Sequence, residues 1–333
     1  MTLYLHGLGH WHPENEISNR FLEELDIGTS DEWILERVGI RSRRTALPLD
    51  YIRTTRNRDV RAAREAAVYS AAQLGAQAAR LAIARAGIAP ADIGLVVGGQ
   101  SMPDYATPAE ACNVACELGL DVPAFDVNSA CTSLLLQIHV LSMMRPEALP
   151  PYVLVVAPEC ATKTVDYSDR ATAVLWGDGA AAAVLSTREP GRALVLGSFI
   201  ASNPAGADRV VVPLAGHFAQ DGRAVQMFAV KKSAEGFTRL RDQFATPGRT
   251  LHFVGHQANL RMLEAVCARC AIPPERHHSN VEWFGNTAAA SSASVLSMHW
   301  ERWCAGDDIA VVGVGAGLTW AGYLVRFGAQ DAA

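Results

Sequence analysis

The residue that the sequence places best as a nucleophile is Cys131. It follows an apolar run that ends near Val127 and a turn of small polar residues, and a helix is predicted to begin around it. A thiol at a helix N-terminus feels the positive end of the helix dipole, which lowers its pKa and raises the thiolate fraction. The free N–H groups of that turn can also bind an oxyanion. The alternative is an inert apolar residue at a helix–sheet contact, because free cysteines are commonly buried.

Two further side chains, an imidazole and an amide, have types that can take part in catalysis. His256 follows an apolar run and precedes a helix, where side chains project into the cleft beyond strand ends, and its imidazole can donate or accept a proton near pH 7. Asn286 follows a glycine in a segment rich in small residues. The alternatives are a hydrogen-bonded histidine at a helix start and a turn or N-cap asparagine. Taken singly, neither residue establishes an active site.

The elements that must position these residues follow an alternating pattern. Short apolar runs bounded by Gly, Pro or Asp are typical of buried strands covered on both faces; they span 93–99, 124–127, 152–157, 180–185, 193–200, 251–255 and 309–314. Helices are predicted between them at 66–86, 130–144 and 259–271. Strands that alternate with helices favour a layered α/β fold. A similar order of elements in both parts suggests an internal duplication, with the join at 186–192.

Composition limits the class of protein. The chain has 333 residues, 50% of them hydrophobic, and a formal net charge of −5, which excludes disorder and disfavours nucleic acid as a principal partner. No apolar run approaches the roughly 18–20 residues that span a bilayer, and the N-terminus carries no signal-peptide pattern. Seven cysteines, an odd number in a long chain, favour reduced thiols and a cytoplasmic location.

The order and spacing of the motifs resemble the β-ketoacyl-ACP synthase III family of thiolase superfamily condensing enzymes. Cys131, His256 and Asn286 fall in the family's order and are followed by the glycine-rich segment 313–320. Four more segments match in order and spacing: 29–41, 168–170, 177–185 and 324–327. Degradative thiolases carry a second cysteine in the C-terminal loop, and elongating synthases carry two histidines; this sequence has neither pattern. The resemblance covers essentially the whole chain.

The resemblance implies a thiolase-like fold with two pseudo-duplicated halves, at 1–188 and 189–333, in layers of helix, sheet, helix, sheet and helix. It also implies a decarboxylating Claisen condensation. Cys131 would take an acyl group from an acyl thioester, with the backbone N–H groups of Cys131 and Ala316 as the oxyanion hole. His256 and Asn286 would hold the thioester oxygen of malonyl-ACP (acyl carrier protein) during loss of CO₂. Ala316 stands where the family has glycine.

The same resemblance assigns binding residues. Those matching the coenzyme A (CoA) site are Trp33, Arg37 and Arg170 around the adenine and Asn259 on the pantetheine arm. Lys231 and Arg261 fall near the carrier-protein docking patch. At the acyl pocket, Thr107 replaces an aromatic residue that reaches from one subunit into its partner, and Val230 lies in an altered segment. These smaller groups predict a medium-chain or otherwise unusual primer rather than acetyl.

An arginine-rich segment and a Cys/His pattern each allow two interpretations from the sequence. Five arginines within 53–64 could add to a phosphate or carrier site, or form a solvated helix face with Asp59 as counterion. Cys267 and Cys270 followed by His277 and His278 superficially suggest zinc, but both cysteines lie in a predicted helix and no second cysteine pair accompanies them, so no metal is expected.

The leading hypothesis is thus a homodimeric, cytoplasmic acyltransferase that condenses an acyl-CoA or acyl-ACP primer with malonyl-ACP, in fatty acid or specialised lipid or polyketide synthesis. It would need no cofactor, since CoA and phosphopantetheine thioesters are its substrates. One alternative is an enzyme of the same fold that moves the acyl group from Cys131 to an alcohol or amine. Another is a non-catalytic partner subunit of a heterodimer.

Overall fold

A nine-stranded sheet forms the centre of the computed structural model, which describes residues 2–328. In spatial order its strands are β11 (Thr250–Gly255), β12 (Asp307–Gly315), β13 (Thr319–Phe327), β8 (Ala193–Ser202), β1 (Leu3–Trp11), β7 (Asp178–Ser186), β6 (Tyr152–Cys160), β4 (Ile93–Gly98) and β5 (Ala124–Asp126). The pairs β4–β5, β4–β6 and β11–β12 are parallel, and the other pairs are antiparallel. All seven strands expected from the sequence are present, with small differences at their ends.

The two halves of the sheet meet at β1. This strand pairs with β7 from Tyr4 to Trp11 but with β8 only from Leu3 to Leu5. The sheet therefore divides into β1, β7, β6, β4 and β5 on one side of this seam and β8, β13, β12 and β11 on the other. The loop between β7 and β8 contains residues 187–192, where the sequence predicted the join.

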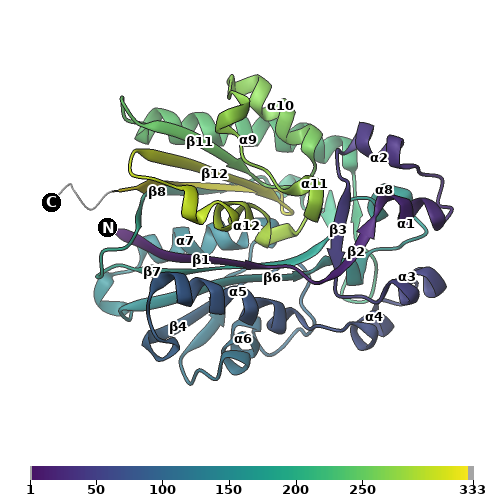
Figure 1. Ribbon diagram of the computed structural model, residues 1–333, viewed down its shortest axis with the longest axis horizontal. Helices are drawn as coiled ribbons and strands as arrows, with labels where there is room; N and C mark the ends of the chain where they lie inside the picture. The colour runs from purple at the N-terminus through teal and green to yellow at the C-terminus, as the bar shows by residue number, and fades with distance from the viewer. Residues whose placement is uncertain (1, 329–333) are drawn as a thin grey trace.

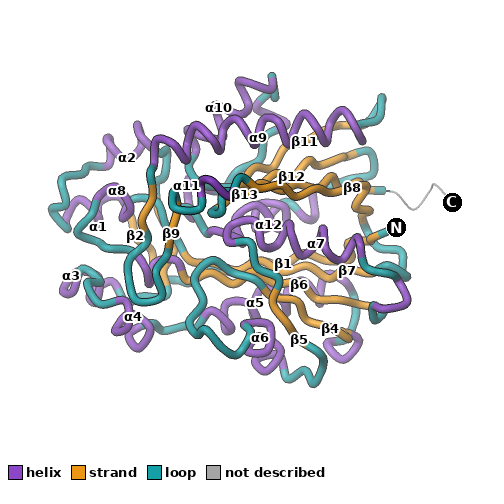
Figure 2. Tube along the Cα trace, turned by 180° about the vertical axis from the view of Figure 1, so that it is seen from behind, coloured by secondary structure: helices purple, strands orange, loops and turns teal. Residues whose placement is uncertain are grey.

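Helices complete five layers, which Figure 1 shows from one side and Figure 2 from behind. The outer layers are α5 (Ala71–Ala86) with α6 (Glu110–Leu118), and α9 (Gly222–Phe244) with α10 (Leu260–Cys270); the middle layer is α7 (Ser133–Met143) with α12 (Ser291–Met298). Three clusters of buried apolar side chains join these layers to the sheet. The expected helix–sheet–helix–sheet–helix arrangement is confirmed.

Shorter elements close one end of the layers, around the ends of β11 and β12. The helices are α1 (Asn19–Glu24), α2 (Asp31–Arg37), α3 (Leu49–Thr55), α4 (Val60–Ala66), α8 (Arg170–Ala173) and α11 (Val281–Phe284). Two small ribbons accompany them: β2 (Asn15–Ser18) with β3 (Ser42–Thr45), and β9 (Val210–Val211) with β10 (Ala219–Gln220). None of the helices in residues 2–328 combines the length and the apolar character needed to cross a membrane.

The central strand β1 was not recognised in the sequence. Glycines and histidines interrupt its apolar run, and the glycines are there because α5 lies directly on the strand. A Cβ atom at Gly9 would stand 1.8 Å from the carbonyl oxygen of Ala78, and one at Gly7 would stand 2.2 Å from that of Ala82. Only glycine permits so close an approach of strand and helix backbones.

The start predicted for the helix at 66–86 is wrong, because α5 begins at Ala71. The Ser70 side chain accepts the N–H of Gln73 at 3.2 Å, and the Gln73 side chain accepts the N–H of Ser70 at 3.0 Å. This capping box fixes the first turn and separates α5 from α4.

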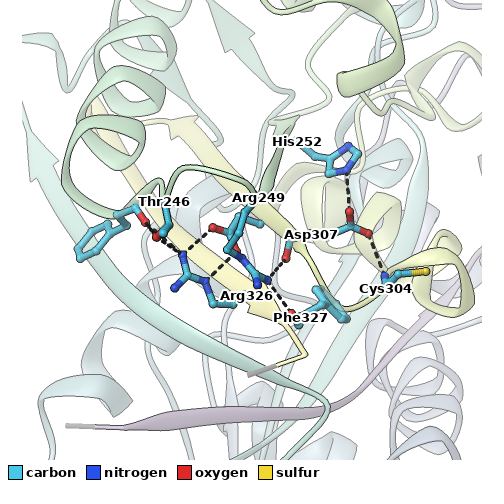
Figure 3. Close-up of polar contacts among 9 residues, drawn as sticks. Thr246, Arg249, His252, Cys304, Asp307, Arg326 and Phe327 are labelled. Atoms are coloured by element: carbon cyan, nitrogen blue, oxygen red, sulfur yellow. Dashed lines mark hydrogen bonds and ion pairs between the residues drawn. The ribbon is translucent and has the colours of Figure 1, made fainter. Parts of the chain in front are cut away.

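A buried carboxylate at the start of β12 bonds an arginine that precedes β11 and another at the end of β13; Figure 3 shows these two arginines, Arg249 and Arg326. Asp308, 1% exposed, accepts hydrogen bonds from Arg249 Nε at 2.7 Å and from Arg326 Nη2 at 2.7 Å. Arg249 immediately precedes β11, while Asp308 and Arg326 lie on β12 and β13. The network therefore sets the relative position of strands whose opposite ends reach the candidate site described next.

Candidate active site

Cys131 lies in a single 3-10 turn, Ala130–Thr132, between β5 and α7. Ala130 adopts a positive φ of 47°, so the chain turns sharply just before the cysteine. Gly315, at the end of β12, packs against this turn: a Cβ there would be 3.3 Å from the Cβ and from the backbone N of Cys131. The sequence placed the cysteine correctly between strand and helix, although the regular helix starts three residues later than expected.

The expectation that the helix dipole lowers the pKa of Cys131 is wrong. Burial of the thiol, followed by the negative charge of Glu159, raises its pKa to about 12. The N–H groups of Cys131 and Ala316 and the hydroxyl of Ser101, which lies 3.9 Å from Cys131 Sγ, act in the opposite direction. The resting thiol is therefore protonated, and the two N–H groups of the predicted oxyanion hole do face the sulfur.

His256 follows β11 directly and is 4% exposed. Burial lowers its pKa to about 4, so the imidazole is neutral at pH 7. Its Nδ1 lies 2.7 Å from Ser291 Oγ, the first residue of α12. Ser291 Oγ already accepts the N–H of Gln257 at 3.3 Å, and in residues 2–328 the acceptor available to its hydroxyl proton is His256 Nδ1. We therefore assign the ring proton to Nε2, which leaves a neutral N–H donor.

Asn286 is 6% exposed, and its orientation is fixed by its own loop. Its side-chain oxygen accepts the N–H of Ala288 at 2.9 Å, which leaves the amide NH₂ as the group free to act on a ligand. The backbone of Asn286 pairs with the strand-like segment around Trp176, through Asn286 N to Leu175 O at 2.8 Å and Gly177 N to Asn286 O at 3.1 Å. The asparagine is thus both a turn residue and an available donor.

These residues line one cavity of about 220 Å³. Cys131, His256, Asn286 and Ala316 all contribute to its wall. Cys131 belongs to the first half of the chain, and the other three belong to the second. A thiol, two neutral donors and two backbone N–H groups around one space can form a thioester and stabilise negative charge on a carbonyl oxygen.

Glu159 and Ser101 complete the site but were not recognised in the sequence. Glu159 is fully buried, and burial raises its pKa to about 8. Its Oε1 accepts the N–H of Ser101 at 2.8 Å and that of Ala289 at 3.1 Å, so it joins the Ser101 loop to the loop of Asn286. A single glutamate at the end of an apolar run gave no sequence signal, because its partners are backbone groups distant along the chain.

The predicted CoA residues lie together at the mouth of the cavity. The guanidinium carbon of Arg170 lies 5.0 Å from the centre of the Trp33 ring, and that of Arg37 lies 5.9 Å from it. Arg37 and Asn259 line the cavity itself. Asn259 also caps α10, with its side-chain oxygen accepting the N–H of Met262 at 2.8 Å. Both guanidinium groups contact the Trp33 ring, and a purine that stacked on this ring would take the place of one of them.

The two predicted docking residues have different surroundings. Lys231 is exposed and lines a shallow groove on α9 and α10 that also contains Arg223 and Arg269. Arg261 instead bonds Glu264 at 2.8 Å and the carbonyl oxygen of Leu35 at 2.7 Å. Arg261 therefore holds α10 against α2, and Arg223 and Arg269 are the cations that accompany Lys231.

Neither predicted acyl-pocket residue lines the Cys131 cavity within the single chain. Thr107 is exposed on the loop before α6, and Val230 lies in the α9 groove beside Lys231. The Cys/His pattern that superficially suggested zinc is spread over different elements. Cys267 and Cys270 are half-buried on α10, while His278 Nε2 lies 3.0 Å from His252 Nδ1.

The arginine-rich stretch is mostly solvated. Arg53 pairs with Asp50 at 2.8 Å, whereas Asp59 caps α4 and is not the expected counterion. Arg64, at the end of α4, lies against a second cavity.

A layered fold whose halves bring a Cys-His-Asn set and two backbone N–H groups into one cavity defines an acyl-transferring condensing enzyme. Family models described as 3-oxoacyl-[acyl-carrier-protein (ACP)] synthase III and its C-terminal part match residues 125–204 and 243–327. A beta-ketoacyl-[acyl-carrier-protein] synthase III from Syntrophomonas wolfei is 32% identical, over 98% of this chain and 98% of that protein.

Solved structures of the same family have the same fold as this chain. A crystal structure of 3-oxoacyl-[acyl-carrier-protein] synthase III from Aquifex aeolicus matches with a TM-score of 0.85 and 28% identity, over 98% of this chain and all of that one. A priming β-ketosynthase from a polyketide biosynthetic pathway matches with a TM-score of 0.81 and 30% identity, over 98% and 96%. The chain belongs to the β-ketoacyl-ACP synthase III family, and the resemblance stated from its sequence is confirmed.

Proposed function

We propose that this protein condenses an acyl-CoA primer with malonyl-ACP by way of an acyl-Cys131 intermediate. The observation that carries the proposal is the meeting of Cys131, His256, Asn286 and the Ala316 N–H at one cavity. In the first step the Cys131 sulfur attacks the thioester carbon, the bond from that carbon to the CoA sulfur breaks, and the thiol proton passes to the departing CoA. The N–H groups of Cys131 and Ala316 hold the oxyanion.

In the second step malonyl-ACP replaces CoA. Its thioester oxygen accepts hydrogen bonds from His256 Nε2 and the Asn286 amide, and negative charge builds on that oxygen as CO₂ leaves. The enolate carbon then attacks the acyl carbon, the carbon–sulfur bond to Cys131 breaks, the departing thiolate takes a proton from water, and the β-ketoacyl-ACP product departs. Each donor is worth roughly 3–4 kcal/mol at the transition state. Neutral donors suit this step, since no proton is removed from malonate, and the reaction uses no cofactor.

The mouth of the cavity supports the choice of substrates. Trp33 and Arg170 would bind the CoA adenine, Arg37 lies beside them, and Asn259 would bind the pantetheine arm. The cationic groove of Lys231, Arg223 and Arg269 would attract an acidic carrier protein although the net charge of the chain is −5.

We also propose a homodimer. Strand β5 lies at the edge of the sheet with one side unpaired in the described chain, and its Phe125 is 41% exposed. A second copy placed against β5 would cover this edge, which is otherwise open to unwanted pairing, and would bring Thr107 near the partner's site. Light scattering after gel filtration at micromolar protein would give twice the monomer mass. Seven unpaired cysteines support a reducing compartment, and we propose the cytoplasm.

One experiment tests the reaction. The protein is incubated with acetyl-, butyryl- and octanoyl-CoA, and the mass of the intact protein is followed before and after malonyl-ACP is added, with Cys131→Ala as control. An acyl adduct that malonyl-ACP discharges to β-ketoacyl-ACP supports condensation. An adduct discharged only by an alcohol or amine would instead show an acyltransferase to those acceptors. No adduct would show a non-catalytic subunit.

A further inference from the structure

A second cavity, of about 50 Å³, lies behind Ser101. Its apolar wall includes Met102 and Val60, and its polar wall includes Lys163, Asp104 and Arg64. A water-sized group needs roughly 10–15 Å³ of such space, so the cavity has room for about three to five of them. This is the space of a short chain, below the medium length that the sequence suggested.

The second cavity adjoins the nucleophile. Ser101 lines it and also places its hydroxyl 3.9 Å from Cys131 Sγ. The β9–β10 hairpin covers both spaces: Val210 and Phe218 at its base line the Cys131 cavity, and its loop, 212–216, lines the second one. An acyl group on Cys131 that passed Ser101 would enter the second cavity.

The polar wall carries two cations and one carboxylate, and the carboxylate of Asp178 also interacts with Lys163 from outside the cavity. Lys163 is 5% exposed, and both hydrogen bonds of its ammonium go to Asp104, at 2.9 and 3.2 Å. Asp104 also accepts the N–H of Ala71 at 3.1 Å. Arg64 has no hydrogen-bond or ion-pair partner in residues 2–328. The formal charge of these three side chains is +1, and a third ammonium N–H and a whole guanidinium remain free for a ligand.

We propose that this enzyme prefers a primer whose acyl chain ends in a carboxylate, that is, the CoA thioester of a short dicarboxylic acid. The proposal rests on the proposed function, because the chain must first be attached to Cys131. The terminal carboxylate accepts charge-assisted hydrogen bonds from Lys163 and Arg64, while the methylene groups between it and the thioester pass Met102 and Val60. A plain alkyl chain would instead place a methyl group against the ammonium of Lys163 and gain no hydrogen bond.

The test compares primers of equal length. Acylation of Cys131 is timed by intact mass with succinyl-CoA against butyryl-CoA, and with glutaryl-CoA against pentanoyl-CoA. At least one carboxylate primer reacts about tenfold or more faster than its uncharged counterpart, as a charge-assisted contact predicts. Equal rates in both pairs, or faster reaction of both uncharged primers, would overturn the proposal.

Variants test whether Lys163 and Arg64 cause the difference in acylation rate between carboxylate and uncharged primers. Lys163→Met lowers the ratio of the two rates toward one, whichever way the absolute rates move, and Lys163→Arg restores part of it. Arg64→Gln, at an exposed position that does not endanger folding, also lowers the ratio. Lys232→Met is the matched control, because Lys232 bonds Glu235 on α9 away from this cavity, and it leaves the ratio unchanged. An unchanged ratio in both Lys163→Met and Arg64→Gln would refute the assigned site.

Failure of this inference and failure of the proposed function give different results. If acetyl- or butyryl-CoA acylates Cys131 and malonyl-ACP discharges the adduct, but the dicarboxylic thioesters react no faster, the proposed preference for a carboxylate primer is refuted and the proposed condensation stands. If no thioester acylates Cys131, both proposals fall.

Discussion

Replacing Ser291 by alanine tests how His256 is made into a donor. The hydroxyl of Ser291 is the group that holds the proton of His256 on Nε2, through its contact of 2.7 Å with Nδ1. The ring stays buried and neutral without it, since its low pKa of about 4 comes from burial alone. What Ser291→Ala changes is therefore the choice of tautomer and the orientation of the ring.

The size of the effect follows from that single contact. A buried neutral hydrogen bond is worth about 1–1.5 kcal/mol, which corresponds to about a tenfold loss of rate. If the ring adopts the other tautomer completely, the donor is lost and the decrease approaches 10²- to 10³-fold. We expect condensation by Ser291→Ala to fall by about tenfold or more, whereas acylation of Cys131, which does not use His256 in the proposed mechanism, changes by less than about twofold.

The assay separates the two steps. Enzyme already acylated on Cys131 is mixed with malonyl-ACP, and CO₂ release and β-ketoacyl-ACP are timed; the acylation rate is measured separately. Ser297→Ala is the matched control, because Ser297 is a buried serine on the same helix whose Oγ bonds His10 Nδ1 at 2.8 Å. If Ser291→Ala and Ser297→Ala condense at the same rate, or if acylation falls as much as condensation, the assigned role of Ser291 is wrong.

Three further predictions concern other parts of the molecule. Burial raises the pKa of Glu159 to about 8, above its unfolded value of 4.5, so the native state loses stability as pH rises from about 4.5 to 8. Glu159→Gln lacks this ionisation, so its melting temperature, measured from pH 5 to 9, should rise relative to that of the wild type as pH increases. Arg170→Ala removes one partner of Trp33 and should raise KM for acyl-CoA about five- to thirtyfold, but should leave KM unchanged for an acyl-pantetheine donor that lacks the adenine. Asp308→Ala leaves two arginines without their carboxylate and should lower the free energy of unfolding by about 3 kcal/mol in urea titrations, with Cys131 acylation at 25 °C unchanged; an unchanged midpoint would contradict its structural role.

The sequence predicted the fold and the residues around the cavity well where the signal is local. Continuous apolar runs marked the strands, and the Cys-His-Asn order together with the glycine-rich end of β12 marked the site. Strand β1 was missed because Gly7 and Gly9 look like turn residues, although their lack of a side chain is what allows α5 to lie on the strand. A close approach between segments some 70 residues apart leaves no mark within a short window of sequence.

Electrostatics were the least predictable feature. A helix N-terminus suggested a lowered pKa for Cys131, but burial and the charge of Glu159 outweigh it. Glu159, Ser291 and Ser101 act through contacts with residues up to 130 positions away, so their importance depends on the completed fold. The hydrogen bonds of Arg261 to Glu264 and to the carbonyl oxygen of Leu35 were likewise not indicated by its basic side chain alone.

The seam at β1 has a consequence for how activity reports on the folded state. Cys131 lies on one side of it, while His256, Asn286 and the Ala316 N–H lie on the other, and strand pairing across it spans only three residue pairs. Neither half contains a working site, so two fragments cut within 187–192 would each be inert and would recover Cys131 acylation only by reassociating. Because the cavity needs groups from both sides of the seam, turnover by this chain should report on whether the two sides are docked.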